Sequence, residues 1–235
     1  MNRLINFFEC LVFFASLSFV ACSEDSSSSA DFDAFLSEIN YVEGTVVDSR
    51  DGQTYKTVTI GSQTWMAQNL NYQTAYSYCY GDDTSNCAKY GRFYKWVAAV
   101  GKSESECGFG HICSLPSGNI QGVCFSGWHL PSLTEWETLF SVIGGYSKAG
   151  KVLKSTSGWA VGKDCMDAIG FSAFATGFRN GYGVYDFEGY DANFWCSTEY
   201  DKSGAYNMYL HVDYDGASLG STGKEDGLSV RCLKD

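Results

Sequence analysis

Residues 127–139 constrain the fold more than any other stretch, because a short apolar strand there runs directly into an amphipathic helix. Pro131 cannot continue a strand ladder and biases Leu130 to an extended conformation, so the boundary falls at this point. Ser132 is the expected N-cap, and Glu135 completes a capping box. Apolar residues follow at helical spacing: Leu133, Trp136, Leu139, Phe140 and Ile143. We therefore predict a helix that covers a core with one face and ends at Gly144-Gly145.

The first 21 residues have the pattern of a targeting segment rather than of a folded element. Arg3 supplies a positive charge, residues 4–20 are largely apolar, and Ala21 precedes Cys22. This pattern resembles a bacterial lipoprotein signal, in which Cys22 becomes the lipidated first residue of the mature chain. An ordinary signal peptide that is cut nearby is the alternative. We expect an outer-membrane protein, on the periplasmic side or at the cell surface, that is held to the membrane by a lipid anchor only.

Residues 22–41 are predicted to form a flexible tether, because a tract rich in serine and acidic residues buries too little apolar surface to fold. Apolar residues at positions 32, 35, 36 and 39 leave one or two turns of helix open. The acidic residues directly after Cys22 resemble the surface-export signals of some outer-membrane lipoproteins. Residues 42–235 have the length of one good-sized domain.

The formal net charge of −11 limits the classes of partner. Phosphates would be repelled, so no nucleic acid is expected as a partner. The same charge argues against a polybasic attachment to anionic lipid. The aromatic content of 16%, together with 26 glycines, indicates short strands joined by turns.

Eight cysteines follow Cys22, which is an even number in a chain predicted to be exported. Disulfides persist outside the cytoplasm, so we predict four of them. No Cys-x-x-Cys pair occurs, which argues against zinc-ribbon and thioredoxin-type sites. The candidates are Cys79, Cys87, Cys107, Cys113, Cys124, Cys165, Cys196 and Cys232.

Residue patterns predict strands at both ends of the domain. A three-stranded antiparallel opening is expected from residues 45–47, 55–60 and 63–66, which turn signals separate. Helical spacing predicts a helix over 90–100, whereas 144–170 has a linker-like composition in which 151–154 could be a strand or a turn of helix. Further strands are expected at 171–178, 194–198, 205–212 and 228–233. Five tryptophans on these elements are expected in the core: Trp65, Trp96, Trp128, Trp136 and Trp195.

Several motifs occur together in one order and spacing. They are Ile60 to Tyr72, Tyr78-Cys79-Tyr80 with Cys87 to Trp96, Gly122-Val123-Cys124 with Gly127 to Ser132, Phe194 to Glu199, and Ser229 to Asp235. In these motifs the chain from Gly44 to Asp235 resembles the Fibrobacter succinogenes major paralogous domain. More distantly, the Leu-Pro-Ser helix start and the terminal Val-Arg-Cys strand resemble the fold of C-type lectin-like domains and of the formylglycine-generating enzyme. The resemblance implies an α+β domain with a small twisted antiparallel sheet, two helices, long loops and disulfides.

The resemblance also bears on the disulfides. Family members commonly have Ser at the position of Cys196, so Cys165 and Cys196 look like an added pair. The remaining pairs are then expected to be Cys79–Cys87, Cys107–Cys113 and Cys124–Cys232. Eight cysteines allow about 105 connectivities, so other pairings stay open.

The sequence contains no recognisable catalytic constellation. None of the three histidines (His111, His129 and His211) stands in a His-x-x-x-His or His-Glu-x-x-His pattern, and no confident metal site is expected. His129, between Trp128 and Leu130, is expected to be buried and hydrogen-bonded. Formylglycine-generating enzymes use a pair of active-site cysteines in a motif that this chain does not reproduce. We expect no enzyme, with an enzyme of that type as the least favoured alternative.

The candidate binding region is the loop 179–193, together with the loop 213–226. Tyrosine rings stack on sugar faces while Asp, Asn and Glu accept hydroxyl hydrogens, so this composition suits contact with a glycan. The candidate ligand-binding residues are Tyr182, Tyr185, Asp186, Glu188, Tyr190, Asp191 and Tyr214. Asp186, Glu188, Asp191 and Asn193 could also supply oxygens to Ca²⁺, although the lectin-like calcium signatures are absent. Alternatively, the tyrosines pack as cross-strand pairs and the acids only solvate the loops.

These features together favour a surface-exposed outer-membrane lipoprotein with a non-catalytic binding or adhesion domain. Its expected partner is a polysaccharide or a surface protein. A structural envelope protein that contacts other proteins is the alternative.

Overall fold

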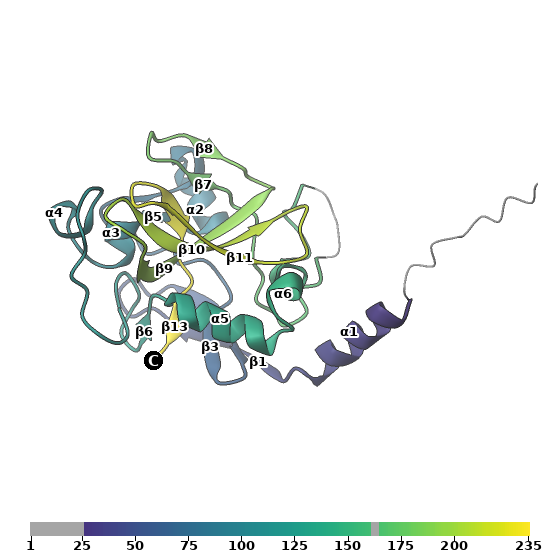
Figure 1. The fold of residues 1–235 in the computed structure, drawn as a ribbon. Helices are drawn as coiled ribbons and strands as arrows, with labels where there is room; N and C mark the ends of the chain where they lie inside the picture. The colour runs from purple at the N-terminus through teal and green to yellow at the C-terminus, as the bar shows by residue number, and fades with distance from the viewer. Residues whose placement is uncertain (1–25, 161–164) are drawn as a thin grey trace, which may run out of the picture.

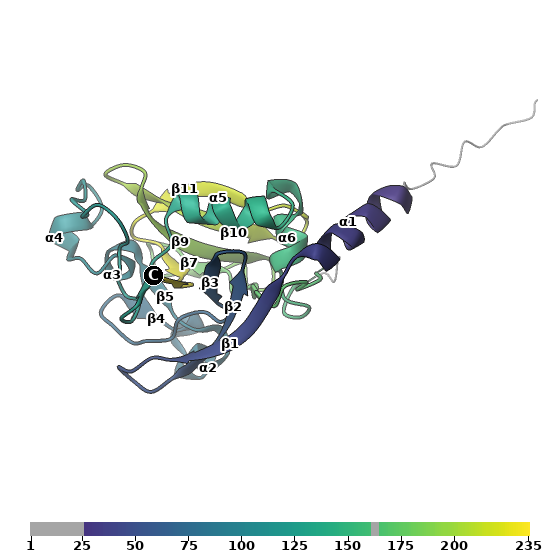
Figure 2. The same ribbon diagram turned by 90° about the horizontal axis from the view of Figure 1, so that it is seen from below.

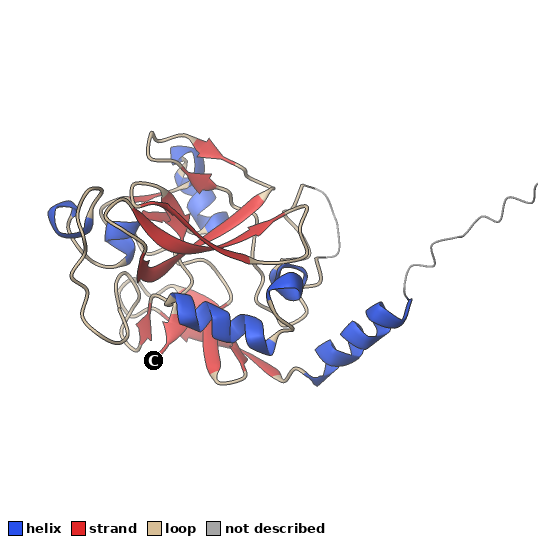
Figure 3. Ribbon diagram, in the orientation of Figure 1, coloured by secondary structure: helices blue, strands red, loops and turns tan. Residues whose placement is uncertain are grey.

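The computed structural model describes residues 26–160 and 165–235, with side chains from residue 31 onward. The predicted signal segment 1–21 and the predicted lipidation site Cys22 lie outside the described residues. The described chain forms an α+β domain in which two mainly antiparallel sheets are accompanied by helices (Figures 1 and 3). No described helix is long and apolar enough to cross a membrane.

The first sheet has five strands in the order β1-β2-β3-β13-β6. Its strands are β1 (Tyr41–Val47), β2 (Thr54–Ile60), β3 (Gln63–Met66), β13 (Leu233–Lys234) and β6 (Trp128–His129). β1, β2 and β3 pair antiparallel, which confirms the predicted three-stranded opening. β2 alternates between exposed and buried residues along its first half, as expected of a strand with one face on a core.

The second sheet follows the order β11-β10-β9-β12-β5-β4. Its strands are β11 (Ser218–Gly223), β10 (Gly204–His211), β9 (Asp191–Glu199), β12 (Gly227–Ser229), β5 (Phe93–Lys95) and β4 (Ser77–Tyr78). A small hairpin of β7 (Phe178–Arg179) and β8 (Tyr185–Asp186) joins this sheet where Arg179 pairs with Gly227.

The segment 227–234 belongs to both sheets. β12 lies between β9 and β5 in the second sheet, and β13 lies between β3 and β6 in the first. The predicted continuous strand 228–233 is therefore broken, with Val230, Arg231 and Cys232 buried at the crossing between the sheets. Each sheet thus receives one of its internal strands from this single segment.

The helices of the described chain are α1 (Ser26–Glu38), α2 (Thr84–Tyr90), α3 (Trp96–Ala99), α4 (Glu104–Cys107), α5 (Leu133–Val142) and α6 (Tyr146–Leu153), with a 3₁₀ turn η1 at Tyr80–Asp82. Among these described helices, α1, α5 and α6 are the longest, with 13, 10 and 8 residues. α5 begins as predicted: the Ser132 and Glu135 side chains each accept a hydrogen bond from the other residue's backbone amide, which forms the capping box. Its buried face carries Trp136, Leu139 and Phe140.

The α5 face lies in a core shared by both sheets. Trp65 and Val58 reach this core from the first sheet, and Phe194 and Met208 reach it from the second. A second cluster surrounds Trp96, Trp195 and Trp128. All five tryptophans predicted in the core are at most 5% exposed.

The predicted tether is wrong for most of its length, because residues 26–38 form α1. The helix leads into β1 at one side of the domain (Figure 2). Phe32 is buried, its ring lies 4.3 Å from the Lys148 ammonium, and Phe35, Leu36 and Ile39 pack against the same core. The few apolar residues of this segment therefore order it by packing on the domain.

The single helix predicted over 90–100 is also wrong. α2 ends at Tyr90, and Phe93–Lys95 pairs with β12 before the short α3 begins. Gly91 has φ +73°, and a Cβ there would lie 2.6 Å from the Asn69 Cβ. Glycine is therefore required at this sharp turn, which separates the helix from the strand.

Two further segments differ from their predicted structure. Residues 171–178 contain only isolated bridges at Ala173 and Gly177 and the start of β7, instead of a strand. The linker-like 144–170 contains α6, whose Val152 and Leu153 are buried in the main core. The composition of residues 151–154 allowed either a strand or a turn of helix. Burial of Val152 and Leu153 in the core favours the helix.

His129 is buried between two carboxylates, as the prediction of a hydrogen-bonded core histidine required. Its Nδ1 lies 2.7 Å from Asp235 Oδ1, and its Nε2 lies 2.9 Å from Glu135 Oε1. Two acceptors of this kind favour the imidazolium, in which both ring nitrogens are donors. Burial by itself lowers the pKa of His129, but the hydrogen bonds to Glu135 and Asp235 outweigh it, so the pKa is raised.

We expect the free energy of unfolding to fall as the pH rises above about 6.5, the ordinary histidine pKa. A group whose pKa is raised on folding stabilises the protein below its unfolded pKa, and this stability is lost as the pH passes the folded value. Urea denaturation of wild type and His129→Gln between about pH 6 and pH 9 measures the effect. In His129→Gln the free energy of unfolding should fall less steeply with rising pH than in wild type. In the control His111→Gln, which changes an exposed histidine, it should fall as in wild type. An identical slope in His129→Gln would contradict the assignment.

Candidate functional site

The hairpin of β7 and β8 carries the loop predicted to bind ligand. Asn180 closes its turn: the Asn180 Oδ1 accepts hydrogen bonds of 3.0 Å from the backbone amides of Tyr182 and Val184. Gly183 adopts φ +90° in this turn. Tyr182 therefore stands at the tip, where it is 97% exposed.

Behind the hairpin lies a hollow of about 440 Å³, which we call the aromatic cleft. Its lining residues are Tyr80, Tyr185, Asp186, Phe187, Glu188 and Tyr190. The rings of Tyr80 and Tyr185 lie 5.3 Å apart, and Phe187 stacks on Phe178 at 5.8 Å. Phe187 has φ +63°, a conformation that is strained for a bulky residue. The cleft is therefore a concave surface of rings with two carboxylates among them.

The polar groups of the cleft are held by neighbouring elements. The Tyr185 hydroxyl donates to Asp82 Oδ1 at 2.6 Å, and the Tyr90 hydroxyl donates to Glu188. Burial, followed by the hydrogen bond with Asp82, raises the pKa of Tyr185 to about 12. Tyr185 thus stays neutral at physiological pH. Within the described chain, Asp186 accepts a single long hydrogen bond of 3.4 Å from the Asn180 side-chain amide.

The structure brings four of the seven predicted ligand residues together: Tyr185, Asp186, Glu188 and Tyr190. Tyr182 lies at the hairpin tip outside the cleft, and Tyr214 lies beside His211, with ring centroids 5.1 Å apart. Asp191 is part of β9 and only 8% exposed, so it does not line the cleft either. Its burial raises its pKa. Strand pairing with β10 places Asp191 within the sheet instead of in the loop.

Sequence reasoning missed two residues of the cleft. Phe187 lies in the predicted loop, but the candidates there are tyrosines, acids and amides, and phenylalanine is none of these. Tyr80 comes from η1, which the Cys79–Cys87 disulfide holds beside α2, 98 positions before the hairpin begins at Phe178. The sequence signals at Tyr80 are the motif Tyr78-Cys79-Tyr80 and the expected Cys79–Cys87 disulfide, and neither points to the hairpin.

Three of the four predicted disulfides are present: Cys79–Cys87, Cys107–Cys113 and Cys124–Cys232. The predicted Cys165–Cys196 bond is wrong, since the structure contains no bond between these residues. Cys196 is fully buried in the main core on β9, whereas Cys165 is half-buried on the segment after α6. Burial raises the pKa of the Cys196 thiol. In the described part of the chain, no group of three or more His, Cys, Asp or Glu side chains could hold a metal ion. The calcium hypothesis stays a prediction.

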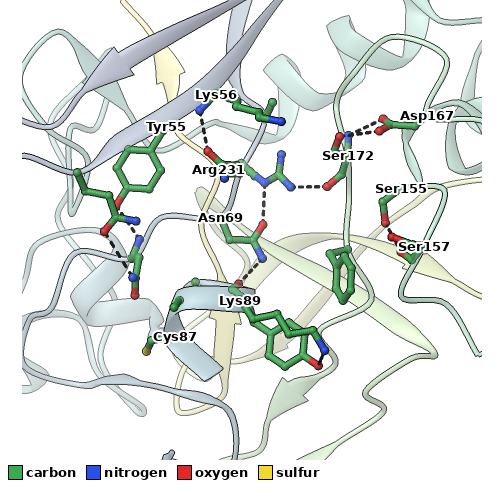
Figure 4. Close-up of a pocket in the computed structure, with 18 of the residues that line it drawn as sticks. Tyr55, Lys56, Asn69, Cys87, Lys89, Ser155, Ser157, Asp167, Ser172 and Arg231 are labelled. Atoms are coloured by element: carbon green, nitrogen blue, oxygen red, sulfur yellow. Dashed lines mark hydrogen bonds between the residues drawn. The ribbon is translucent and has the colours of Figure 1, made fainter. Parts of the chain in front are cut away.

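A second hollow of about 300 Å³ lies next to the aromatic cleft, and we call it the polar pocket (Figure 4). Its lining comes from β2, residues 67–71, α2 with Gly91, residues 155–157, residues 167–174 and Arg231. Asn69 is buried in it and donates through Nδ2 to the Tyr90 carbonyl at 2.9 Å. Tyr90 connects the two hollows, because it lines the pocket while its hydroxyl binds Glu188 of the cleft.

Comparison with known proteins gives one finding. The family model described as the Fibrobacter succinogenes major domain matches residues 58–234, which is most of the chain. No curated protein and no solved structure matches the chain.

Proposed function

The chain belongs to the Fibrobacter succinogenes major domain family, and we propose that this member is a non-catalytic binding module for polysaccharide. The proposal includes lectin-like architecture, a lipid anchor at Cys22 and exposure on the outer membrane. The observation that carries it is the aromatic cleft, where exposed rings and carboxylates share one concave surface.

Rings and carboxylates perform different tasks in sugar recognition. Phe187 is 52% exposed and Tyr190 is 48% exposed, so both offer apolar faces on which a sugar ring can stack. Asp186 and Glu188 retain lone pairs that can accept hydrogens from hydroxyls. A cleft about 440 Å³ in volume lies within the range of ligand pockets.

The test is binding of the exported chain, without its first 22 residues, to an array of neutral and acidic polysaccharides. Tyr190→Ala and Phe187→Ala should each weaken binding by about tenfold, which corresponds to about 1.4 kcal/mol of lost ring contact. Tyr200→Ala is the matched control, since Tyr200 is 57% exposed directly after β9, and that strand spans roughly 26 Å from Asp191 to Glu199. Absence of binding to every polymer, or equal losses in all three variants, would overturn the proposal.

A structural envelope protein that contacts other proteins is the second candidate. The exposed apolar residues of the hairpin, Tyr182 and Val184, favour it. This function predicts that Tyr182→Ala and Val184→Ser release co-purified proteins while no polysaccharide binds at all. An enzyme of the formylglycine-generating type requires reactive thiols, and the buried Cys196 should resist labelling in the native protein.

A further inference from the structure

The polar pocket concentrates positive charge in a protein whose formal net charge is −11. Lys56, Lys89 and Arg231 line it, and Asp167 is the one carboxylate among its lining residues. These side chains come from β2, from α2 and from the crossing between β12 and β13 (Figure 4). An acidic chain that gathers three cations around one hollow presents a local attraction for an anion.

Arg231 carries a buried charge that no carboxylate pairs with in the described part of the chain. Its Nε donates to Asn69 Oδ1 at 2.7 Å, and its terminal nitrogens donate to backbone carbonyls. These carbonyls are those of Met66, Phe171 and Ser172, at 3.0, 2.7 and 2.8 Å. Burial lowers the pKa of Arg231 to about 9, which leaves it charged at neutral pH. A buried charge surrounded by neutral oxygens is stabilised further by an anion nearby.

Asp167 does not fill this role. Its two carboxylate oxygens accept hydrogen bonds of 2.6 Å from the Ser172 backbone amide and hydroxyl. It acts on Arg231 only as a more distant charge. The carboxylate therefore fixes the Ser172 wall of the pocket.

The two lysines lie on different sides of the pocket, Lys56 beside Arg231 and Lys89 beside the Tyr90 ring (Figure 4). Lys56 is exposed at the pocket, and no described hydrogen bond or ion pair engages its ammonium. Lys89 donates to the Tyr90 hydroxyl at 2.6 Å, which leaves two of its three donors. Neither lysine forms an ion pair within the described residues, although the Glu188 carboxylate lies on the other side of the Tyr90 hydroxyl that Lys89 binds.

The remaining wall suits a ring that bears hydroxyls. Amide and hydroxyl side chains line it, and the Oδ1 of Asn71 is buried without a hydrogen-bond partner. The rings of Tyr90 and Phe174, 5.5 Å apart, form an apolar side. A hollow about 300 Å³ in volume is at the small end of ligand pockets, so it fits one ring.

We propose that the polar pocket is a second binding site, which takes the carboxylate and hydroxyls of an acidic sugar residue of the hexuronate class. Lys56 contacts the carboxylate, Arg231 supplies the fixed positive charge behind it, and Lys89 at the other side of the pocket adds to the attraction for the anion. Amides and hydroxyls of the wall bind the ring hydroxyls. The site is separate from the aromatic cleft and does not depend on the cleft binding polysaccharide.

Titration of the exported chain with D-galacturonate and D-glucuronate tests the proposal, followed by NMR or calorimetry. The neutral counterparts galactose, glucose and methyl galacturonate should bind at least tenfold more weakly, and uronate affinity should fall with added salt. Inorganic phosphate is a separate arm. Uronate binding no tighter than that of the neutral sugars, or phosphate binding tighter than uronate, would overturn the proposal.

Lys56→Ala/Lys89→Ala should lose at least tenfold in uronate affinity. Both lysines are exposed, so the fold should be retained. Lys202→Ala/Lys234→Ala is the matched control, because it removes the same charge from exposed lysines that do not line the pocket. Equal affinity in the two double variants would exclude the pocket as the site. Tyr190→Ala should leave uronate binding unchanged, which separates failure of this site from failure of the aromatic cleft.

Discussion

Removal of the Cys124–Cys232 disulfide by a double alanine substitution should destabilise the domain by about 5 kcal/mol. The bond joins residues 108 positions apart, and the chain-entropy cost of closing a loop of that length is of this size. Small domains have total stabilities of about 5–15 kcal/mol, so the variant should be close to unfolding. Guanidinium denaturation under oxidising conditions measures the change.

The matched control is the double alanine variant of Cys107 and Cys113. This bond spans only 6 positions, so its removal should destabilise the domain by about 2 kcal/mol on the same model. Cys107 is buried much like Cys124, which keeps the loss of packing similar at that position. Equal losses in the two variants would show that loop length does not set the stabilisation here.

Trp136→Ala should destabilise the domain by about 3–5 kcal/mol, the range for a large aromatic residue removed from a packed core. Trp136 is fully buried on α5, with its ring 4.4 Å from Trp65 and 5.9 Å from Phe194. It therefore links the helix to both sheets. The same denaturation measurement reports the loss.

Two further variants separate the causes of that effect. The indole nitrogen of Trp136 is buried and has no hydrogen-bond partner among the described residues, so Trp136→Phe keeps a ring and removes an unsatisfied donor. It should lose less than half as much stability as the alanine variant. Trp159→Ala should also lose less, because Trp159 is only half-buried at the edge of the same core. A loss in Trp136→Phe equal to that in Trp136→Ala would contradict this account.

Local patterns predicted the elements whose signals lie close together in the sequence. The capping box of Ser132 and Glu135, the first three strands and the core tryptophans are of this kind. The full length of α1, of which the sequence indicated at most one or two turns, and the break at Gly91 could not be predicted, because both depend on contacts with residues outside the segment. Tertiary packing overrides the local propensity of residues for helix or strand where the two favour different structures.

The residues of the two hollows also fall into those that local patterns indicate and those that only the tertiary fold brings together. The composition of the loop 179–193 indicated four residues of the aromatic cleft, since tyrosines and acids occur there together. Tyr80 could not be assigned to the cleft from the sequence, because only the tertiary fold brings η1 next to the hairpin. The polar pocket could not be predicted, because its residues come from widely separated segments of ordinary composition.

The segment 227–234 has a consequence for how the protein is made. Synthesis proceeds from the amino terminus, yet an internal strand of each sheet comes from these late residues. Neither sheet can be completed until the ribosome has released them, so the domain cannot reach its folded structure earlier in translation. The outer-membrane location that we propose would benefit from this delay, because a chain that has not yet folded can pass through a narrow translocation channel.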